Sequence, residues 1–456
     1  MYDMSRRKFL GSTAVTAGAF SLGNISGCST PSPEKPTAEN IRWQLLDGID
    51  RENIKITDVK ITLLSYELPP EEQWIIHWGR WAKEGCVCWK TDSILMEVFT
   101  DQGIVGIGGP SQYGGPEVMK KYTEEVIKPS IIGQNPFDIE LLSCGSVPLA
   151  RGARTGWAGI DAALWDIIGK AKNMPVYKLL ATDNEPNPYV WTYASAGEIY
   201  KSSKWPEDLI EEAFRHRENG FDAFKFRPWI AWQYTTPYFK RHMTLKEYIP
   251  ILRKLREAVG PDFYLIQTDA SSMGLTIEQY LEELCPVLEE LNILFLQQPM
   301  SNSGDDAIEN YAKLNEALPN VLIAGGEGIS HRSGFRELID YDYYDIVQPD
   351  CGICGITEAW YIARVAHLKG KLCAPHNWHG GFTTMENASL TAGVPNGYIL
   401  EYNQTFNPMR EGIFKEPLVV KNGHMDLPDR PGFGLEIIDD VEKKFPFLPG
   451  DYKAVR

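Results

Sequence analysis

Polar residues that could do chemistry follow a series of short apolar stretches in the second half of the chain. Asp350 and His376 would make a carboxylate–imidazole pair, in which the carboxylate orients the ring and the ring accepts a proton. Lys225 would place a cation near the same point. We therefore predict that these three residues are catalytic, with His376 as the base.

A second group of side chains at equivalent positions offers oxygen atoms. Asp269, Gln297 and Glu327 each follow a different apolar stretch. Carboxylate and amide oxygens are the ligands that a hard cation such as Mg²⁺ prefers. A single residue of this kind is usually a turn or cap residue, but one in each of several successive units is harder to explain in that way. The pattern predicts a site for one divalent cation, Mg²⁺.

The elements that must position these residues alternate regularly from about residue 189 onward. Short apolar runs typical of strands are separated by amphipathic runs typical of helices. The strand candidates are Tyr189–Tyr193, Ala223–Phe226, Phe263–Gln267, Ile293–Leu296, Val321–Ala324, Tyr344–Val347, Lys371–Ala374 and Tyr398–Leu400, and the helices include Asp208–Glu218, Leu245–Val259 and Ile277–Leu291. This order predicts an α/β fold, a modified TIM (β/α)7-8 barrel with its chemistry at the carboxyl ends of the strands.

The chain before and after the barrel has a different pattern. Strand-like stretches at Ile54–Tyr66 and Asp92–Thr100 precede helical patterns that run to about residue 180. We expect an α+β N-terminal capping domain at residues 53–187 and the barrel at 188–404. Residues 405–456 are predicted to form a C-terminal segment that returns to the capping domain.

The first residues resemble an export signal. Arg6 and Arg7 precede an apolar run of small residues that ends at Cys28, a pattern typical of a twin-arginine signal with a lipoprotein processing site. We predict a signal at residues 1–28 and a linker at 29–52. The mature protein would be a periplasmic or outer-membrane lipoprotein that meets the membrane only through a lipid anchor at Cys28.

The charge of the chain limits its partners. The formal net charge is −16 and the pI is about 5.1, which argues against nucleic acid and anionic membranes as partners. The chain has eight cysteines, including a Cys351-x-x-Cys354 pair. Their irregular spacing does not predict a disulfide framework, and this pair is interpreted as two small apolar residues.

The set of residues at the strand ends resembles the enolase superfamily, in its mandelate racemase and muconate lactonising branch. The stretch Gly159–Lys170, GIDAALWDIIGK, also resembles a helix of that family, and the likeness extends over residues 53–405. It implies metal ligands after strands three, four and five, a His–Asp pair after strands seven and six, and a Glu after strand eight, here Glu401. It also implies removal of a proton next to a carboxylate, an Mg²⁺ cofactor and a symmetric homo-oligomer.

Two positions depart from the family pattern. Gln297 stands where the family usually has Glu, so this ligand brings no charge. Arg227 stands where a second Lys acts as a base, and a guanidinium stays protonated at any ordinary pH. A single base, His376, favours loss of a β-hydroxyl over racemisation. We therefore predict a carbon–oxygen lyase in which Arg227 and Glu401 bind the substrate.

The substrate is predicted from location and from aromatic loops. His77, Trp78, Trp229 and His379 are expected to line the substrate pocket, because aromatic faces stack on sugar rings and cations pair with acids. The aromatic residues could equally pack in a core or at an oligomer contact. An exported enzyme meets polysaccharide fragments, so we predict dehydration of the non-reducing-end uronic acid of oligosaccharides, of ulvan type for example, to a 4,5-unsaturated uronate.

Three alternatives stay open at this stage. The enzyme could dehydrate free sugar acids such as aldonates. It could be an epimerase, racemase or cycloisomerase on the same scaffold. It could also be a non-catalytic sugar-binding lipoprotein, which Gln297 alone favours, whereas the other residues of the site argue against it. In each case the partner is an acidic carbohydrate.

Overall fold

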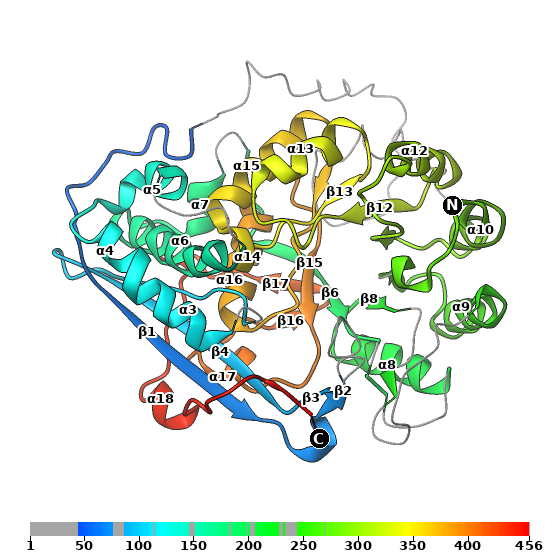
Figure 1. Cartoon of the computed structure of the whole chain (residues 1–456), viewed down its shortest axis with the longest axis horizontal. Coiled ribbons are helices and arrows are strands. Elements are labelled where there is room, and N and C mark those ends of the chain that lie inside the picture. Colours follow the sequence, from blue (N-terminus) through cyan, green and yellow to red (C-terminus); the bar gives the residue numbers. More distant parts are fainter. Residues whose placement is uncertain are drawn as a thin grey trace, which may run out of the picture.

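The computed structural model describes residues 44–75, 86–112, 115–145, 151–181, 184–197, 199–200, 206–227, 231–232, 244–268 and 270–455. Four of the predicted site residues, His77, Trp78, Trp229 and Asp269, lie outside these ranges, as does the predicted signal at 1–28. In Figure 1 an α+β part, blue to cyan, lies beside an α/β part, green to orange. These two parts confirm the predicted fold class.

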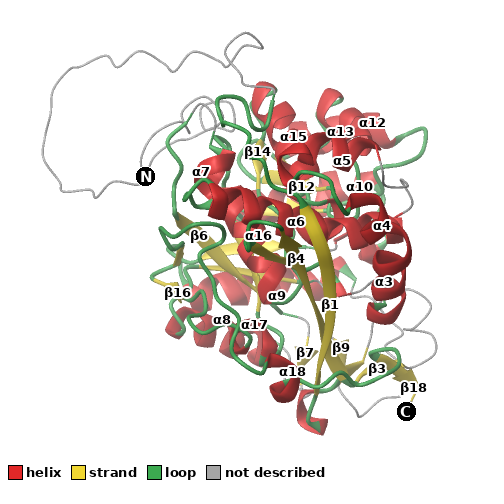
Figure 2. Ribbon diagram, turned by 90° about the vertical axis from the view of Figure 1, so that its left-hand side faces the viewer, coloured by secondary structure: helices red, strands yellow, loops and turns green. Residues whose placement is uncertain are grey.

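The α+β part is built on a three-stranded sheet in the order β1-β4-β5. β1 (Ile56–Glu67) and β4 (Lys90–Thr100) are long and antiparallel, and β5 (Val105–Gly108) follows as a hairpin. Figure 2 shows the helices stacked along these strands. They are α3 (Pro116–Tyr122), α4 (Lys128–Ile131), α5 (Ile139–Gly145), α6 (Arg151–Ala171) and α7 (Val176–Leu180).

Helix α6 contains the GIDAALWDIIGK stretch and packs directly on β5. Two glycines of β5 make this approach possible. A Cβ at Gly106 would lie 2.0 Å from the Ala163 carbonyl oxygen, and one at Gly108 would lie 2.3 Å from the Gly159 carbonyl oxygen. Any larger residue at either position would therefore push the helix off the sheet.

The α/β part is a strongly curled parallel sheet. Its strands are β6 (Tyr189–Ser195), β8 (Ala223–Phe226), β10 (Tyr264–Gln267), β11 (Phe295–Gln297), β12 (Leu322–Gly325), β13 (Ile346–Val347), β14 (Leu372–Cys373) and β15 (Leu400–Asn403). They pair in chain order from β6 to β14, and β15 pairs with β6. A single bridge between Cys373 and Gly397 joins the two ends. The predicted strands correspond to these eight in order.

Helices cover the outside of this sheet. They are α8 (Glu207–Glu218), α9 (Leu245–Val259), α10 (Ile277–Gln279) continuing to α11 (Cys285–Glu290), α12 (Ala307–Ala317), α13 (Arg332–Asp340), α14 (Cys351–Cys354), α15 (Ile356–Leu368) and α16 (Gly381–Gly393). The start of α9 is fixed by a capping box, in which Thr244 and Glu247 hydrogen-bond each other's backbone. Its bounds are those expected from the sequence.

The last part of the chain crosses back over both halves. β17 (His424–Asp426) pairs with β6, and β16 (Val420–Lys421) continues that ladder. β18 (Lys453–Val455) pairs with β3 (Cys86–Cys88), which pairs with β2 (Trp74–Ile75). The short helices α17 (Met409–Gly412) and α18 (Val441–Lys444) lie between these strands.

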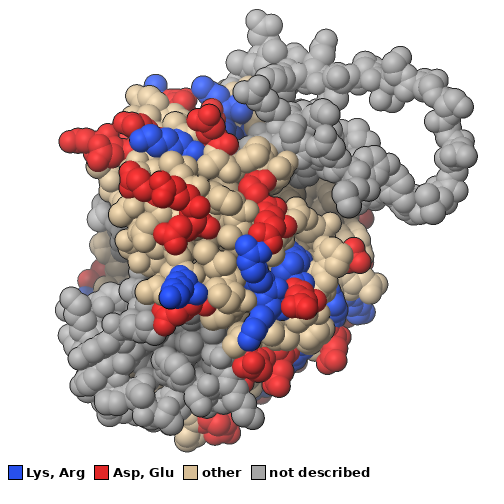
Figure 3. All heavy atoms as spheres, turned by 90° about the vertical axis from the view of Figure 1, so that its right-hand side faces the viewer, with Lys and Arg blue, Asp and Glu red and all other residues tan. Residues whose placement is uncertain are grey.

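The surface and the cysteines carry two further observations. On the described part of the face in Figure 3, Lys and Arg side chains lie among Asp and Glu side chains. Among the residues that the structure describes, no helix is long and apolar enough to cross a membrane.

Cys351 and Cys354 are buried in α14, and burial raises the pKa of both thiols well above its ordinary value. Both thiols therefore stay protonated and uncharged, and they pack as small apolar groups.

Candidate active site

The carboxyl ends of three strands bring predicted residues into direct contact. Lys225 of β8 donates a hydrogen bond from Nζ to Oε1 of Gln297 of β11 over 3.0 Å. The same ammonium forms an ion pair with the carboxylate of Glu401 of β15. All three residues are at most 1% exposed. A cation, an amide and a carboxylate therefore meet inside the mouth of the barrel.

The amide of Gln297 uses both of its ends. Nε2 donates to Oε2 of Glu327 over 2.6 Å, while Oε1 accepts from Lys225. Glu327 follows β12 through Gly326, whose φ of 107° lies in the left-handed region and whose Cβ would lie 2.4 Å from the Phe335 ring. Only glycine fits this turn. It delivers the Glu327 carboxylate to the mouth.

His376 closes these side chains into a ring. Its Nε2 lies 3.7 Å from Oε2 of Glu327 and 4.0 Å from Oε2 of Glu401. Lys225, Gln297, Glu327, His376 and Glu401 thus form a continuous circuit of polar contacts. The structure therefore places five of the predicted site residues around one point.

The other ring nitrogen of His376 is held by Asp350. Nδ1 lies 2.7 Å from Oδ2 of Asp350, which is fully buried and caps α14 by accepting from the Gly352 backbone N–H over 2.8 Å. Burial by itself would raise the pKa of Asp350, but the charges of His379 and His376 and their hydrogen bonds hold that pKa well below its ordinary value. Asp350 is therefore a fixed anion behind the base.

The same surroundings determine the protonation of His376. Burial would lower the pKa of its imidazole, but Glu327, Glu401 and Asp350 together raise that pKa to about 9. With no substrate or cation present, the ring is an imidazolium at neutral pH. A positive charge placed beside Glu327 would lower the pKa again and release the ring to act as a base.

Glu401 is an anion held by several donors. The Ser195 hydroxyl donates to its Oε1 over 2.6 Å, and the Asn377 backbone N–H donates to its Oε2 over 2.9 Å. Burial would raise the pKa of Glu401, but Lys225, His376 and the Ser195 hydrogen bond lower it to about 2. Glu401 therefore stays charged throughout the range of pH in which the enzyme would act.

Arg227 lies one strand period beyond Lys225, and its guanidinium stacks on an aromatic ring. The guanidinium carbon is 4.3 Å from the centroid of the Trp378 ring, and Nη1 donates to the Ala196 carbonyl over 2.8 Å. A stacked, hydrogen-bonded guanidinium is well oriented to bind an anion but cannot accept a proton. The predicted substrate contact of Arg227 stays a prediction.

Asp350, His376 and His379 are also close enough to be considered as metal ligands, since their ligand atoms lie within 4.8 Å of one another. The two N–O separations are 2.7 and 2.6 Å. Two ligands bound about 2.1 Å from one tetrahedral ion would lie about 3.4 Å apart. The observed separations are those of hydrogen bonds, so we interpret this cluster as a hydrogen-bonded triad.

Sequence reasoning missed several contacts of the site. Ser195 ends β6 on the same side as Tyr193 and binds Glu401, so extending the strand-end rule to the first strand would have found it. Gln348 follows β13 and is fully buried, and neither of its amide atoms has a hydrogen-bond partner in the described part of the chain. Ser111 of the capping domain contacts His379 across the domain boundary, which no local pattern indicates.

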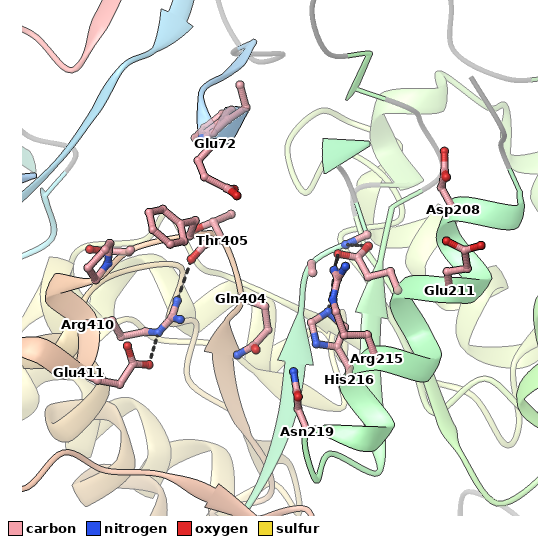
Figure 4. Close-up of a pocket in the computed structure, with 17 residues that line it drawn as sticks. Glu72, Asp208, Glu211, Arg215, His216, Asn219, Gln404, Thr405, Arg410 and Glu411 are labelled. Carbon is pink, nitrogen blue, oxygen red and sulfur yellow. Dashed lines mark hydrogen bonds and ion pairs between the residues drawn. The ribbon is translucent and has the colours of Figure 1, made fainter. Parts of the chain in front are cut away.

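A groove of about 690 Å³ opens beside the ends of β6 and β15. In Figure 4, Gln404, Thr405 and Glu72 lie on one side, and Asp208 and Glu211 of α8 lie on the other. Its walls begin at residues that follow directly after Ser195 and Asn403 in the chain. The groove thus gives room next to the strand that carries Glu401.

Comparison with known proteins places this geometry in a family. The mandelate racemase and muconate lactonizing enzyme N-terminal domain matches residues 87–181, and the enolase C-terminal domain-like family matches residues 208–441. The chain belongs to the enolase superfamily, in its mandelate racemase-like branch. The resemblance stated from the sequence is therefore confirmed.

Several members of the superfamily match over most of their length. An arabinonate dehydratase of Saccharolobus solfataricus is 31% identical over 397 residues, covering 86% of this chain and 99% of that enzyme. A D-galactarolactone cycloisomerase of Agrobacterium fabrum is 29% identical over 408 residues, covering 86% and 99%. The solved structure of an enolase superfamily member from Polaromonas has a TM-score of 0.71 at 26% identity, covering 87% of this chain and 98% of that chain.

Proposed function

We propose that this protein is a sugar-acid dehydratase that removes the proton next to a carboxylate and eliminates a β-hydroxyl. The observation that carries the proposal is His376, whose Nδ1 is bound to Asp350 and whose Nε2 faces the ring of Lys225, Glu327 and Glu401. A buried imidazole in this setting is a proton acceptor with a fixed direction. The dehydratases among its relatives support the same reaction class.

The residues near Glu327 fit a divalent cation by their chemistry. Glu327 offers a carboxylate, and Gln297 could offer an amide oxygen once its amide turns, because it now points Nε2 at Glu327 over 2.6 Å and gives its oxygen to Lys225. Asp269, outside the described residues, is the third oxygen ligand that the sequence predicts. Bound Mg²⁺ would bind the substrate carboxylate and stabilise the negative charge that develops on it. The cation would also offset the negative charge of Glu327 beside the base.

The chain's own residues would carry the proton. Neutral His376 accepts the α-proton at Nε2, while its Nδ1–H stays hydrogen-bonded to Asp350. The resulting imidazolium is stabilised by Asp350, Glu327 and Glu401, the same groups that raise its pKa. As the β-hydroxyl leaves, it takes up one proton and departs as water. Return of that proton from His376 restores the neutral base and balances the reaction.

We further propose that the enzyme is exported and acts on uronate-ended oligosaccharides. The twin arginines and Cys28 support export. The groove beside β6 and β15 supports a substrate longer than one sugar, because its lining includes amide, carboxylate and guanidinium groups that bind hydroxyls. The product would carry a 4,5-unsaturated uronate at its non-reducing end.

A substrate screen tests both levels of this proposal. Glucuronate-ended oligosaccharides and free aldonates would be incubated with the purified protein and Mg²⁺, and loss of one water would be measured by mass spectrometry. We expect loss of water from the oligosaccharides with wild-type protein and none with His376→Asn. Loss of water from aldonates alone would refute the oligosaccharide substrate and retain the reaction. No loss of water from any acid sugar would refute the dehydratase.

A cycloisomerase is the second candidate, because the Agrobacterium fabrum enzyme matches over 99% of its length. It also suits a site with a single base. A cycloisomerase would open or close a ring and leave the mass unchanged. Deuterium entering the carbon next to the carboxylate, without loss of water, would favour it over the dehydratase.

A further inference from the structure

We propose that His379 and Ser111 are positioning residues that couple the capping domain to His376 through Asp350. The proposal rests on the proposed role of His376 as the base. It assigns the second histidine of the His376-Asn-Trp-His379 segment to the support of the base, in place of the substrate contact that the sequence predicts.

The first observation is that both histidines use the same oxygen atom. His376 Nδ1 and His379 Nε2 lie 2.7 and 2.6 Å from Oδ2 of Asp350. The ring centroids are 5.5 Å apart and the planes are nearly perpendicular, at 86°. An ionised carboxylate is only an acceptor, so each histidine must donate to it. This fixes one proton of His376 on Nδ1, so that the neutral ring, when it forms, has Nε2 as its acceptor in the mouth.

The second observation is the place of His379. Its side chain is 1% exposed, whereas that of His376 is 13% exposed. Its remaining nitrogen, Nδ1, lies 3.4 Å from the Ser111 hydroxyl. Both ring nitrogens of His379 are therefore engaged within the protein. The His379 ring therefore lies beside that of His376, against the same oxygen of Asp350.

The third observation is a second attachment of Ser111 to the same short helix. The Ser111 backbone N–H donates to the Gly352 carbonyl over 2.7 Å, and the Gly352 N–H donates to Asp350. A Cβ at Gly352 would lie 2.5 Å from the Thr383 methyl and 3.1 Å from the Ser111 nitrogen. A side chain at position 352 would therefore force Thr383 to move and would crowd Ser111. Ser111 is thus tied to Asp350 by two routes, one through His379 and one through Gly352.

These contacts make a chain from the capping domain to the base. Removal of His379 would leave Oδ2 of Asp350 with one donor fewer, and the carboxylate could then rotate away from His376. The expected loss in kcat is about tenfold to hundredfold, the value of one hydrogen bond to a charged group. KM should change little, because His379 does not face the mouth. Gln at position 379 keeps a donor for Asp350 and should restore most of the loss.

The first test needs no substrate. The full chain has eight histidines, and labelling them with ¹⁵N makes their hydrogen-bonded ring protons visible at low field in the proton NMR spectrum. We expect two such resonances, from His376 Nδ1–H and His379 Nε2–H, and we expect both to persist in EDTA. His379→Leu should remove its own resonance and shift that of His376. His379→Gln should remove its own and leave that of His376 nearly in place.

A buried histidine elsewhere provides the matched control. His216 of α8 is 3% exposed, and neither of its ring nitrogens has a hydrogen-bond partner among the described residues. His216→Gln should leave both low-field resonances unchanged. An unshifted His376 resonance in His379→Leu would overturn the proposal. So would the absence of both resonances, or their appearance only after EDTA treatment, which would indicate a metal in the triad.

The second test is kinetic and uses the acid sugar that loses water in the screen described above. His379→Leu should lower kcat with KM nearly unchanged, His379→Gln should lie close to wild type, and Ser111→Ala should fall between them. A raised KM with unchanged kcat would show a substrate contact and overturn the proposal. If no acid sugar reacts, the proposed function fails, and the NMR test still decides the positioning of His376.

Discussion

Replacing Lys225 with Met tests whether the ring of charges in the mouth holds the fold as well as the site. The Lys225 ammonium and the Glu401 carboxylate form an ion pair, and their side chains are 2% and 0% exposed. Met has a similar length without the charge. In Lys225→Met, Glu401 would keep the Ser195 hydroxyl, the Asn377 N–H and the more distant His376 but lose its nearest cation.

Two lines of reasoning give the size of the loss. The pKa of Glu401 falls from 4.5 to about 2, and one unit is worth about 1.4 kcal/mol, so its partners together stabilise the carboxylate by about 3 kcal/mol. Removing one partner of a buried ion pair costs about 3–5 kcal/mol in other proteins. We therefore expect unfolding to become easier by about 3 kcal/mol. That corresponds to about 6–12 °C in Tm for a barrel of this size.

The dependence on pH gives an independent check with a definite sign. A carboxyl whose folded pKa is lowered contributes its stability above the unfolded pKa of 4.5 and loses it as the pH falls toward about 2. Wild-type protein should lose this contribution across that window. Lys225→Met should lose less, because most of it is already absent.

Thermal and urea unfolding would measure these effects, with a second buried pair as the matched control. Lys90 and Asp92 of β4 lie 3.0 Å apart and are at most 1% exposed, in the capping domain. Lys90→Met should also destabilise the fold, because it leaves Asp92 buried without its cation, and should leave turnover of the folded protein near wild type. Lys225→Met should lower both stability and turnover. A Tm within 1 °C of wild type for Lys225→Met would refute the reasoning.

Three further predictions concern other parts of the site and the domain boundary. Gln297→Glu would place a second carboxylate in contact with Glu327. Without Mg²⁺ the variant should have a lower Tm, and its affinity for Mg²⁺ should be about tenfold or more higher, and calorimetry would measure both. Burial raises the pKa of Asp161 from 3.8 to about 6, so the folded state binds the proton more tightly than the unfolded state does. As the pH rises from about 4 to about 6, the stability of the wild type should therefore fall by about 3 kcal/mol relative to that of Asp161→Asn, which urea titrations would measure. Arg227→Lys keeps the charge but loses the stacked plane, so KM should rise about tenfold with kcat nearly unchanged in steady-state assays.

Much of the fold, and of the circuit of polar side chains in the mouth of the barrel, could be predicted from the sequence, because both depend on short-range patterns. Apolar runs of three to five residues mark the strands, and a parallel barrel puts the residues at or just past the end of each run at one mouth. That rule alone brings Lys225, Gln297, Glu327, Asp350 and His376 together. The rule needs only the order of the elements, which the eight strands confirm.

The contacts that were not predicted depend on the approach of distant segments. His379 follows the base by three residues, as a pocket residue would, but it contacts Asp350 next to the place where Gly352 meets Ser111 of the capping domain. The groove is lined by α8 and by residues 404–411, which are far apart in the sequence. Neither the packing distance nor the side-chain rotation is encoded in a strand or helix pattern.

The charges around the mouth give a physical reason for the unusual Gln297. Lys225 offsets Glu401, and protonated His376 offsets Asp350. The predicted ligands Asp269 and Glu327 carry two negative charges, which one Mg²⁺ would balance. A Glu at position 297 would add a third, and a unit charge about 4 Å from a substrate carboxylate opposes it by up to about 4 kcal/mol near a protein surface. Gln297 thus weakens the binding of the cation and avoids repulsion of the acid substrate. The Gln297→Glu variant should bind Mg²⁺ more tightly and its acid substrate more weakly. A variant that bound both more tightly would show that the charge of this ligand does not set the balance.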